Sequence, residues 1–133
     1  MEKSQVTKTM KETLLSAIET CGLLETLNEV FGKSVRVRLA WSEKELATPM
    51  TDFEFSTRSA NALHNAHAET VGAILDLIET GKLDTLRNVG KKSLSEIRSS
   101  LLAFNYKNLS REERLEFCAD VIALNCELEA SAA

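Results

Sequence analysis

The sequence predicts a mainly α-helical protein. Its centre is expected to be a compact, orthogonal four-helix module containing a helix–hairpin–helix. Three observations carry this prediction. Apolar residues recur at three- and four-residue steps near both ends of the sequence, which indicates an N-terminal helix and a C-terminal helix. Several short helical patterns follow one another between residues 56 and 102. Residues 34–41 change to a period of two, which adds one short β segment.

The N-terminal helix is expected over residues 3–31. Gly22 is placed to kink or divide it, and Gly32 is placed to stop it. This helix can bury its apolar stripe within its own domain, or against a partner helix or a second copy of the protein, which would make a homodimer through the N-terminal extension. The stripe consists of Met10, Leu14, Ile18, Cys21, Leu24, Leu27 and Phe31.

The β segment alternates apolar residues with Arg36, Arg38 and Ala40, as half-buried strands do. One strand cannot satisfy its own backbone, so it needs a partner, either residues 52–55 or a second copy. The two arginines read either as a solvated strand face or as a second basic surface. Ser42 and Glu45 then have the spacing of a capping box, which predicts a short helix.

The central stretch, residues 86–97, reads as a tight turn that opens a helix. Asn88 and Gly90 tolerate positive φ, so the backbone can reverse there. The first turn of the following helix leaves backbone N–H groups free beside two lysines and a hydroxyl, an arrangement suited to phosphate. A plain glycine-stopped connection with solvated lysines is the alternative. The polar residues concerned are Lys91, Lys92 and Ser93.

The segment from Pro49 to about Tyr106 resembles the C-terminal domain of the bacterial RNA polymerase alpha subunit. Two stretches carry the resemblance, RSANAL at residues 58–63 and NVGKKSLSEI at residues 88–97. Residues 70–77 look like the short second helix of that family, and residues 49–55 look like its extended lead-in.

The resemblance implies binding to the minor groove of A/T-rich DNA and contacts with sigma factor and activators. By position, it implies that Arg58 is the main minor-groove side chain. It also implies an acidic surface toward sigma at Asp52 and Glu54. The other DNA-facing positions that it implies are Asn61, Asn88, Gly90, Lys92, Ser93 and Glu96, and we add Lys91 beside them. Thr85 and Arg87 depart from the family, which usually has a lysine and a proline there.

After residue 106 the sequence leaves the family pattern. Ser110 and Glu113 form a second capping box, and the apolar side of the helix that follows is expected to pack on the N-terminal helix. The cysteines, Cys21, Cys118 and Cys126, form no CxxC pair and are expected as buried free thiols. No metal-ligand set, cofactor motif or catalytic constellation stands out, so we expect neither an enzyme nor a metal site.

The predicted organisation is an N-terminal helix–strand extension over residues 1–48, the alpha-like module over residues 49–106, and a C-terminal helix over residues 107–133. The net charge is −4, but residues 82–98 hold five basic residues against two acidic ones. This distribution predicts weak, salt-sensitive DNA contact supplemented by a protein partner. We expect a cytoplasmic, free-standing DNA-binding transcription regulator or RNA polymerase accessory protein. The alternative is a protein-interaction module that mimics the alpha domain toward sigma factor or activators without binding DNA.

Overall fold

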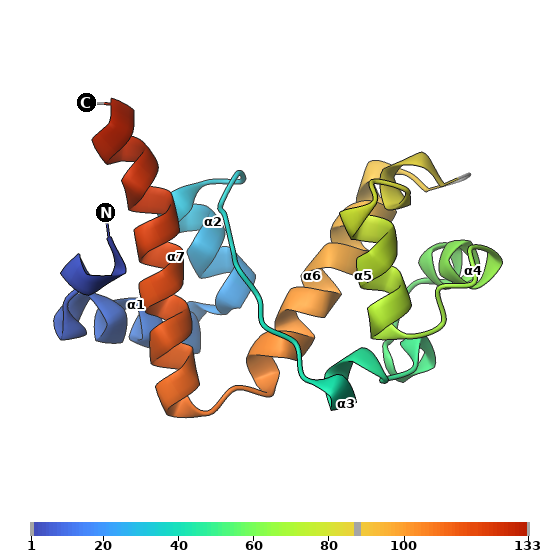
Figure 1. Ribbon diagram of the computed structural model, residues 1–133, viewed down its shortest axis with the longest axis horizontal. Coiled ribbons are helices and arrows are strands. Elements are labelled where there is room, and N and C mark those ends of the chain that lie inside the picture. Colours follow the sequence, from blue (N-terminus) through green and yellow to red (C-terminus); the bar gives the residue numbers. More distant parts are fainter. Residues whose placement is uncertain (1, 87–88, 133) are drawn as a thin grey trace. The chain divides into compact units, whose positions relative to one another are not determined.

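The computed structural model describes residues 2–86 and 89–132, with side chains described to residue 126. The protein is mainly helical, and Figure 1 labels its principal helices. It divides into two compact units. Unit 1 combines Met1–Leu39 with Tyr106–Ala133, and unit 2 is Ala40–Asn105.

Unit 1 begins with η1 (Lys3–Gln5), α1 (Lys8–Cys21) and α2 (Leu23–Phe31). The single helix expected over residues 3–31 is therefore three elements. The Thr7 hydroxyl accepts the Met10 N–H at 3.1 Å and starts α1 anew. Gly22 has φ 97°, a conformation that breaks the helix at little cost only for glycine, and it separates α1 from α2.

The core of unit 1 forms where α1 packs against α7 (Arg111–Ala132), as expected from the two apolar stripes. A capping box starts α7, because Ser110 Oγ accepts the Glu113 N–H at 3.2 Å and Glu113 accepts the Ser110 N–H at 2.9 Å. Burial raises the pKa of the Cys118 thiol to about 11. Cys21 is exposed, which corrects the expectation that all three thiols are buried. The most buried apolar residues here are Leu15, Leu27, Cys118 and Val121.

The prediction of a β segment at residues 34–41 is wrong. Ser34 ends a turn and residues 35–41 run on as an extended segment; their side chains alternate between half-buried and exposed, yet they belong to no strand within the described residues (Figure 1). Side-chain amides bond the backbone instead. Asn125 accepts the Arg36 N–H at 2.9 Å and donates to the Arg36 carbonyl at 3.0 Å, and Asn105 donates to the Ala40 carbonyl at 2.9 Å. The alternation reported half-burial correctly, but half-burial does not require a sheet.

Unit 2 holds the short helices of the predicted module. The expected strand partner at residues 52–55 is also absent from the described structure, where the Phe53 and Phe55 rings stack on each other with centroids 5.2 Å apart. The predicted cap at Ser42 is confirmed, and Ser56 caps α4. The last helix runs to Lys107, five residues beyond the expected end near Leu102. The elements are α3 (Glu43–Leu46), η2 (Met50–Asp52), α4 (Thr57–Asn65), α5 (Val71–Glu79), η3 (Leu83–Thr85) and α6 (Lys91–Lys107).

One apolar cluster joins the elements of unit 2. Its innermost residues belong to α4, α5, η3 and α6, which fixes the ends of these helices relative to one another. The cluster consists of Met50, Leu63, Ala68, Val71, Ile74, Leu83, Ile97 and Leu101. Among the residues that the structure describes, no helix is long and apolar enough to cross a membrane.

Candidate nucleic-acid interface

The first arm of the candidate interface is the N-terminus of α4. Ser56 caps it, since its hydroxyl accepts the Ser59 N–H at 3.3 Å. Ser59 is fully buried and anchors this turn in the core. Arg58 and Asn61 lie on the outer side of the same helix and are exposed. The two residues that the sequence assigned to this arm are therefore both available at the surface.

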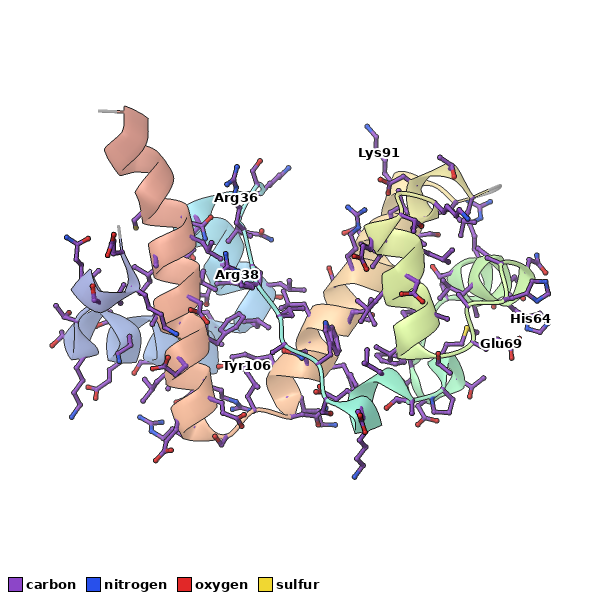
Figure 2. The ribbon with its side chains drawn as sticks, viewed as in Figure 1. Arg36, Arg38, His64, Glu69, Lys91 and Tyr106 are labelled. Atoms are coloured by element: carbon purple, nitrogen blue, oxygen red, sulfur yellow. The ribbon has the colours of Figure 1, made fainter. Side chains whose placement is uncertain are left out.

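The second arm is the N-terminus of α6. Leu94 donates its N–H to the Gly90 carbonyl at 3.1 Å, which makes Gly90 the N-cap. The amides of residues 91–93 then occupy the first turn, where a helix leaves its N–H groups without intrahelical acceptors. Lys91 and Lys92 are exposed, and Figure 2 shows the Lys91 side chain extending away from the helix. Positive charge and first-turn amides without intrahelical acceptors thus lie together at this helix end.

A hydrogen bond from Ser56 to Glu96 holds the two arms together. The Glu96 carboxylate, in the second turn of α6, accepts the Ser56 N–H at 2.8 Å. This bond, supported by the Ser59 hydroxyl, lowers the pKa of the Glu96 carboxyl below its ordinary value. The bond therefore links the two helices that contain the stretches carrying the resemblance. The resemblance had implied that Glu96 faces DNA. Its bond to Ser56 could not be predicted, because nothing in the local sequence indicates a partner forty residues away.

Two residues of the predicted site, Ser93 and Gly90, differ from what the sequence predicted. Ser93 is only 5% exposed, so its hydroxyl is largely covered. Gly90 does not have positive φ, and a Cβ at that position would meet no atom within 4 Å. The fold therefore requires a glycine there neither for its backbone angle nor for space. Asn88 lies outside the described residues.

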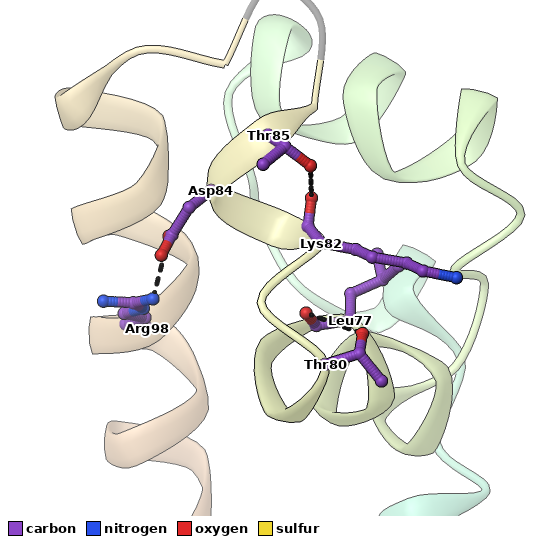
Figure 3. Close-up of polar contacts among 6 residues, drawn as sticks. All are labelled: Leu77, Thr80, Lys82, Asp84, Thr85 and Arg98. Carbon is purple, nitrogen blue, oxygen red and sulfur yellow. Dashed lines mark hydrogen bonds and ion pairs between the residues drawn. The ribbon is translucent and has the colours of Figure 1, made fainter.

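Unit 2 also ties down the segment that leads into the hairpin, as Figure 3 shows. Asp84 in η3 forms an ion pair with Arg98 of α6 at 2.9 Å, and the Thr85 hydroxyl donates to the Lys82 carbonyl at 2.9 Å. Arg98 is thereby partly neutralised. The positive character of residues 82–98 rests on the remaining cations.

A shallow groove of about 350 Å³ runs along α6 beside these residues. It presents two cations and two hydroxyls over an apolar floor. The sequence had drawn attention only to Lys91 in this group, because hydroxyl residues in a helix carry no signal of their own. The lining residues are Lys91, Leu94, Ser95, Arg98 and Ser99.

Other candidate residues lie elsewhere in unit 2. Asp52 and Glu54 are exposed near η2. His64 Nδ1 lies 2.6 Å from a Glu69 carboxylate oxygen in an exposed pair, visible in Figure 2. Among the side chains that the structure describes, those of residues 2–86 and 89–126, no three of His, Cys, Asp or Glu are placed to hold a metal ion.

Comparison with known proteins gives this geometry a context. Residues 40–103 match a family model, that of the C-terminal domain of the bacterial RNA polymerase alpha chain. This segment resembles that domain. The match spans nearly the whole of unit 2, and both arms of the candidate interface fall inside the alpha-like segment.

Curated relatives carry the name of the same subunit. The DNA-directed RNA polymerase subunit alpha of Roseiflexus sp. (strain RS-1) is 39% identical over 59 residues, which are 44% of this chain and 18% of the relative. The subunit of Corynebacterium glutamicum (strain R) is 32% identical over 101 residues, 70% of this chain and 29% of the relative. The protein thus spans less than a third of these relatives. No solved structure gave a significant match.

Proposed function

We propose that this protein binds DNA through the two helix N-termini of unit 2 and acts in transcription. The likeness to the alpha C-terminal domain supports a DNA-binding or RNA polymerase-related role. The observation that supports binding through two helix N-termini is the bond between Glu96 and Ser56. It joins the arm that carries an exposed arginine to the arm that carries exposed lysines and free amides.

In this proposal Arg58 enters the minor groove of A/T-rich DNA. A narrow A-tract groove concentrates negative potential, and an arginine side chain is long and permanently charged. Lys91 and Lys92 contact flanking phosphates, and the first-turn amides of α6 bind a phosphate oxygen directly. Gly90 suits that contact, because the absence of a side chain lets the DNA backbone approach the helix end closely.

The remaining members of the predicted site take different roles in this proposal. Asn61 lies exposed one turn after Arg58 and contacts the same groove. Ser93 contributes its backbone N–H, since its hydroxyl is covered. Glu96 positions the arms, and Asn88, outside the described residues, stays a predicted DNA-facing residue.

We further propose that the protein works as a free-standing regulator or polymerase accessory protein. The segments before and after unit 2 pack on each other and form a core of their own in unit 1. Self-association through the N-terminal extension stays a prediction, and light scattering at several concentrations tests it.

Fluorescence anisotropy tests the DNA contact. A labelled A-tract duplex is compared with a G/C duplex at low and at physiological salt, for the wild type, Arg58→Ala and Lys44→Ala. Lys44 is an exposed lysine on α3, so its removal controls for the lost charge. We expect Arg58→Ala to weaken A-tract binding by more than about 1 kcal/mol and to abolish the preference. Equal losses in the two variants would refute the groove contact.

A second candidate function is a protein-interaction module that faces sigma factor or activators. The exposed carboxylates of Asp52 and Glu54 favour it, because neither forms an ion pair within the described residues. Capture of RNA polymerase holoenzyme by the immobilised protein, reduced by Asp52→Lys, would support this function. Capture unchanged by that substitution would remove these residues from the contact.

A further inference from the structure

A second basic surface lies in unit 1, outside the segment that matches the alpha domain. It is the extended segment at residues 35–39, where the exposed Arg36 and Arg38 share one side of the backbone. The half-buried Val35, Val37 and Leu39 point the other way. This alternation fixes which face of the segment meets solvent, and that face carries both arginines.

The Asn125 side chain fixes the backbone at the centre of this segment. Its amide oxygen accepts the Arg36 N–H at 2.9 Å, and its amide nitrogen donates to the Arg36 carbonyl at 3.0 Å and to the Val121 carbonyl at 2.7 Å. The amide thus pairs with Arg36 as a neighbouring strand would. Holding the backbone in this way leaves the arginine side chain free for another contact and reduces the ordering cost of binding.

The charges of these arginines are not used within the described structure. Neither forms an ion pair there, although other cations of unit 1 do. Lys3 contacts Glu116 at 2.7 Å, and Arg111 contacts Glu19 at 3.5 Å. Figure 2 shows Arg36 and Arg38 projecting from the extended segment. Two guanidinium groups without an ion-pair partner among the described residues, on a fixed backbone, are suited to bind carboxylate or phosphate groups in a bidentate manner.

The spacing of the arginines fits one kind of ligand. Residues two apart in an extended segment are separated by about 6.6 Å along the backbone. Successive phosphates of one DNA strand lie about 7 Å apart, since each step combines a rise of about 3.4 Å with the turn of the helix. We propose that Arg36 and Arg38 bind two successive phosphates of a DNA strand, as a sequence-independent contact outside the alpha-like segment. This inference rests on the proposed DNA-binding function.

The salt dependence of DNA binding tests this contact. Each phosphate neutralised contributes about 0.9 to the slope of log affinity against log salt. We therefore expect Arg36→Ala/Arg38→Ala to flatten the slope by about 1.8, which corresponds to about a tenfold smaller loss of affinity between 50 and 200 mM salt. The ratio of A-tract to G/C affinity should not change, because phosphate contacts carry no base information.

Two further variants isolate the effect. Lys8→Ala/Lys107→Ala removes the same charge from exposed positions of unit 1 and should change the slope by less than half as much. Arg36→Lys/Arg38→Lys keeps the charge and should restore most of the slope, which excludes a folding defect as the cause. Circular dichroism melting curves of all variants are recorded alongside.

The outcomes separate this inference from the proposed function. One outcome is that Arg58→Ala loses the A-tract preference while Arg36→Ala/Arg38→Ala shows the same salt slope as the Lys8→Ala/Lys107→Ala control. This outcome would overturn the inference and leave the proposed function in place. The same result is expected if the arginines bind an acidic protein instead of DNA. Absence of wild-type binding to either duplex even at low salt would overturn both.

Discussion

The hydrogen bonds between the Asn125 side chain and the extended segment offer the sharpest test of the structure. Asn125→Ala deletes three side-chain hydrogen bonds, two to the Arg36 backbone at 2.9 and 3.0 Å and one to the Val121 carbonyl at 2.7 Å. A neutral hydrogen bond of this kind contributes about 1 kcal/mol, so the three bonds contribute about 3 kcal/mol to the free energy of unfolding. Alanine gains about 0.5 kcal/mol of helix propensity over asparagine in α7. The expected net loss is therefore about 2.5 kcal/mol.

Asn125→Asp gives a second prediction, which concerns the order of stability of the two variants. The carboxylate still accepts the Arg36 N–H, but an oxygen now replaces the nitrogen that faces the Arg36 and Val121 carbonyls at 3.0 and 2.7 Å. Two acceptors at such distances repel each other, so we expect the aspartate variant to be less stable than the alanine variant at pH 7, despite its closer shape. Lowering the pH should narrow the difference as the carboxyl takes up a proton and can donate again.

Urea unfolding followed by circular dichroism measures the free energy of unfolding of both variants. Hydrogen exchange of the Arg36 amide reports directly on its bond to Asn125. Asn28→Ala is the matched control, since Asn28 is an exposed asparagine of α2 whose side chain makes no hydrogen bond within the described structure. Equal stability of the Asn125→Ala and Asn28→Ala variants would refute the claim that the Asn125 hydrogen bonds stabilise the fold. So would an aspartate variant that is more stable than the alanine variant, or unchanged exchange at Arg36.

Two further predictions concern the interface in unit 2. The pKa of Glu96 is lowered in the folded state, so its bond to Ser56 stabilises the fold fully above pH 4.5, the ordinary value, and less as the pH falls through the lowered pKa. The difference in urea midpoint between wild type and Glu96→Gln should thus be largest above pH 4.5 and shrink at lower pH, and a constant difference would contradict this. Gly90→Ala should leave the melting temperature nearly unchanged, because the backbone angle and the space admit a methyl group. In anisotropy it should weaken DNA binding several-fold, and wild-type affinity would contradict the close approach of DNA.

The elements that sequence reasoning located correctly are those with short-range signals. Both capping boxes, at Ser42 and Ser110, start helices where their spacing indicated, and Gly22 divides the N-terminal helix. In each case the decisive contacts lie within four residues, so the sequence itself displays them. The helix bound near Leu102 was less accurate, because nothing in the local pattern ends α6 there.

The parts that sequence reasoning missed depend on partners far along the sequence. The period of two at residues 34–41 reports which side chains face the core, but the backbone partner, Asn125, lies 89 residues away from Arg36. A single amide side chain leaves no periodic trace in the sequence. The roles of Ser56 and Glu96 were hidden for the same reason, since the bond between them spans forty residues.

The position of Glu96 also bears on how the proposed DNA contact could form on an acidic protein with so small a basic surface. The net charge is −4, and a free carboxylate beside the two helix N-termini would oppose phosphate binding. By accepting the Ser56 N–H, Glu96 turns its charge toward the N-terminus of α4, where it is stabilised. Arg58, Lys91 and Lys92 then face solvent without an ion-pair partner among the described residues. The bond that joins the two arms thus also directs the Glu96 carboxylate toward the N-terminus of α4. This placement favours the proposed phosphate contact despite the negative net charge of the protein.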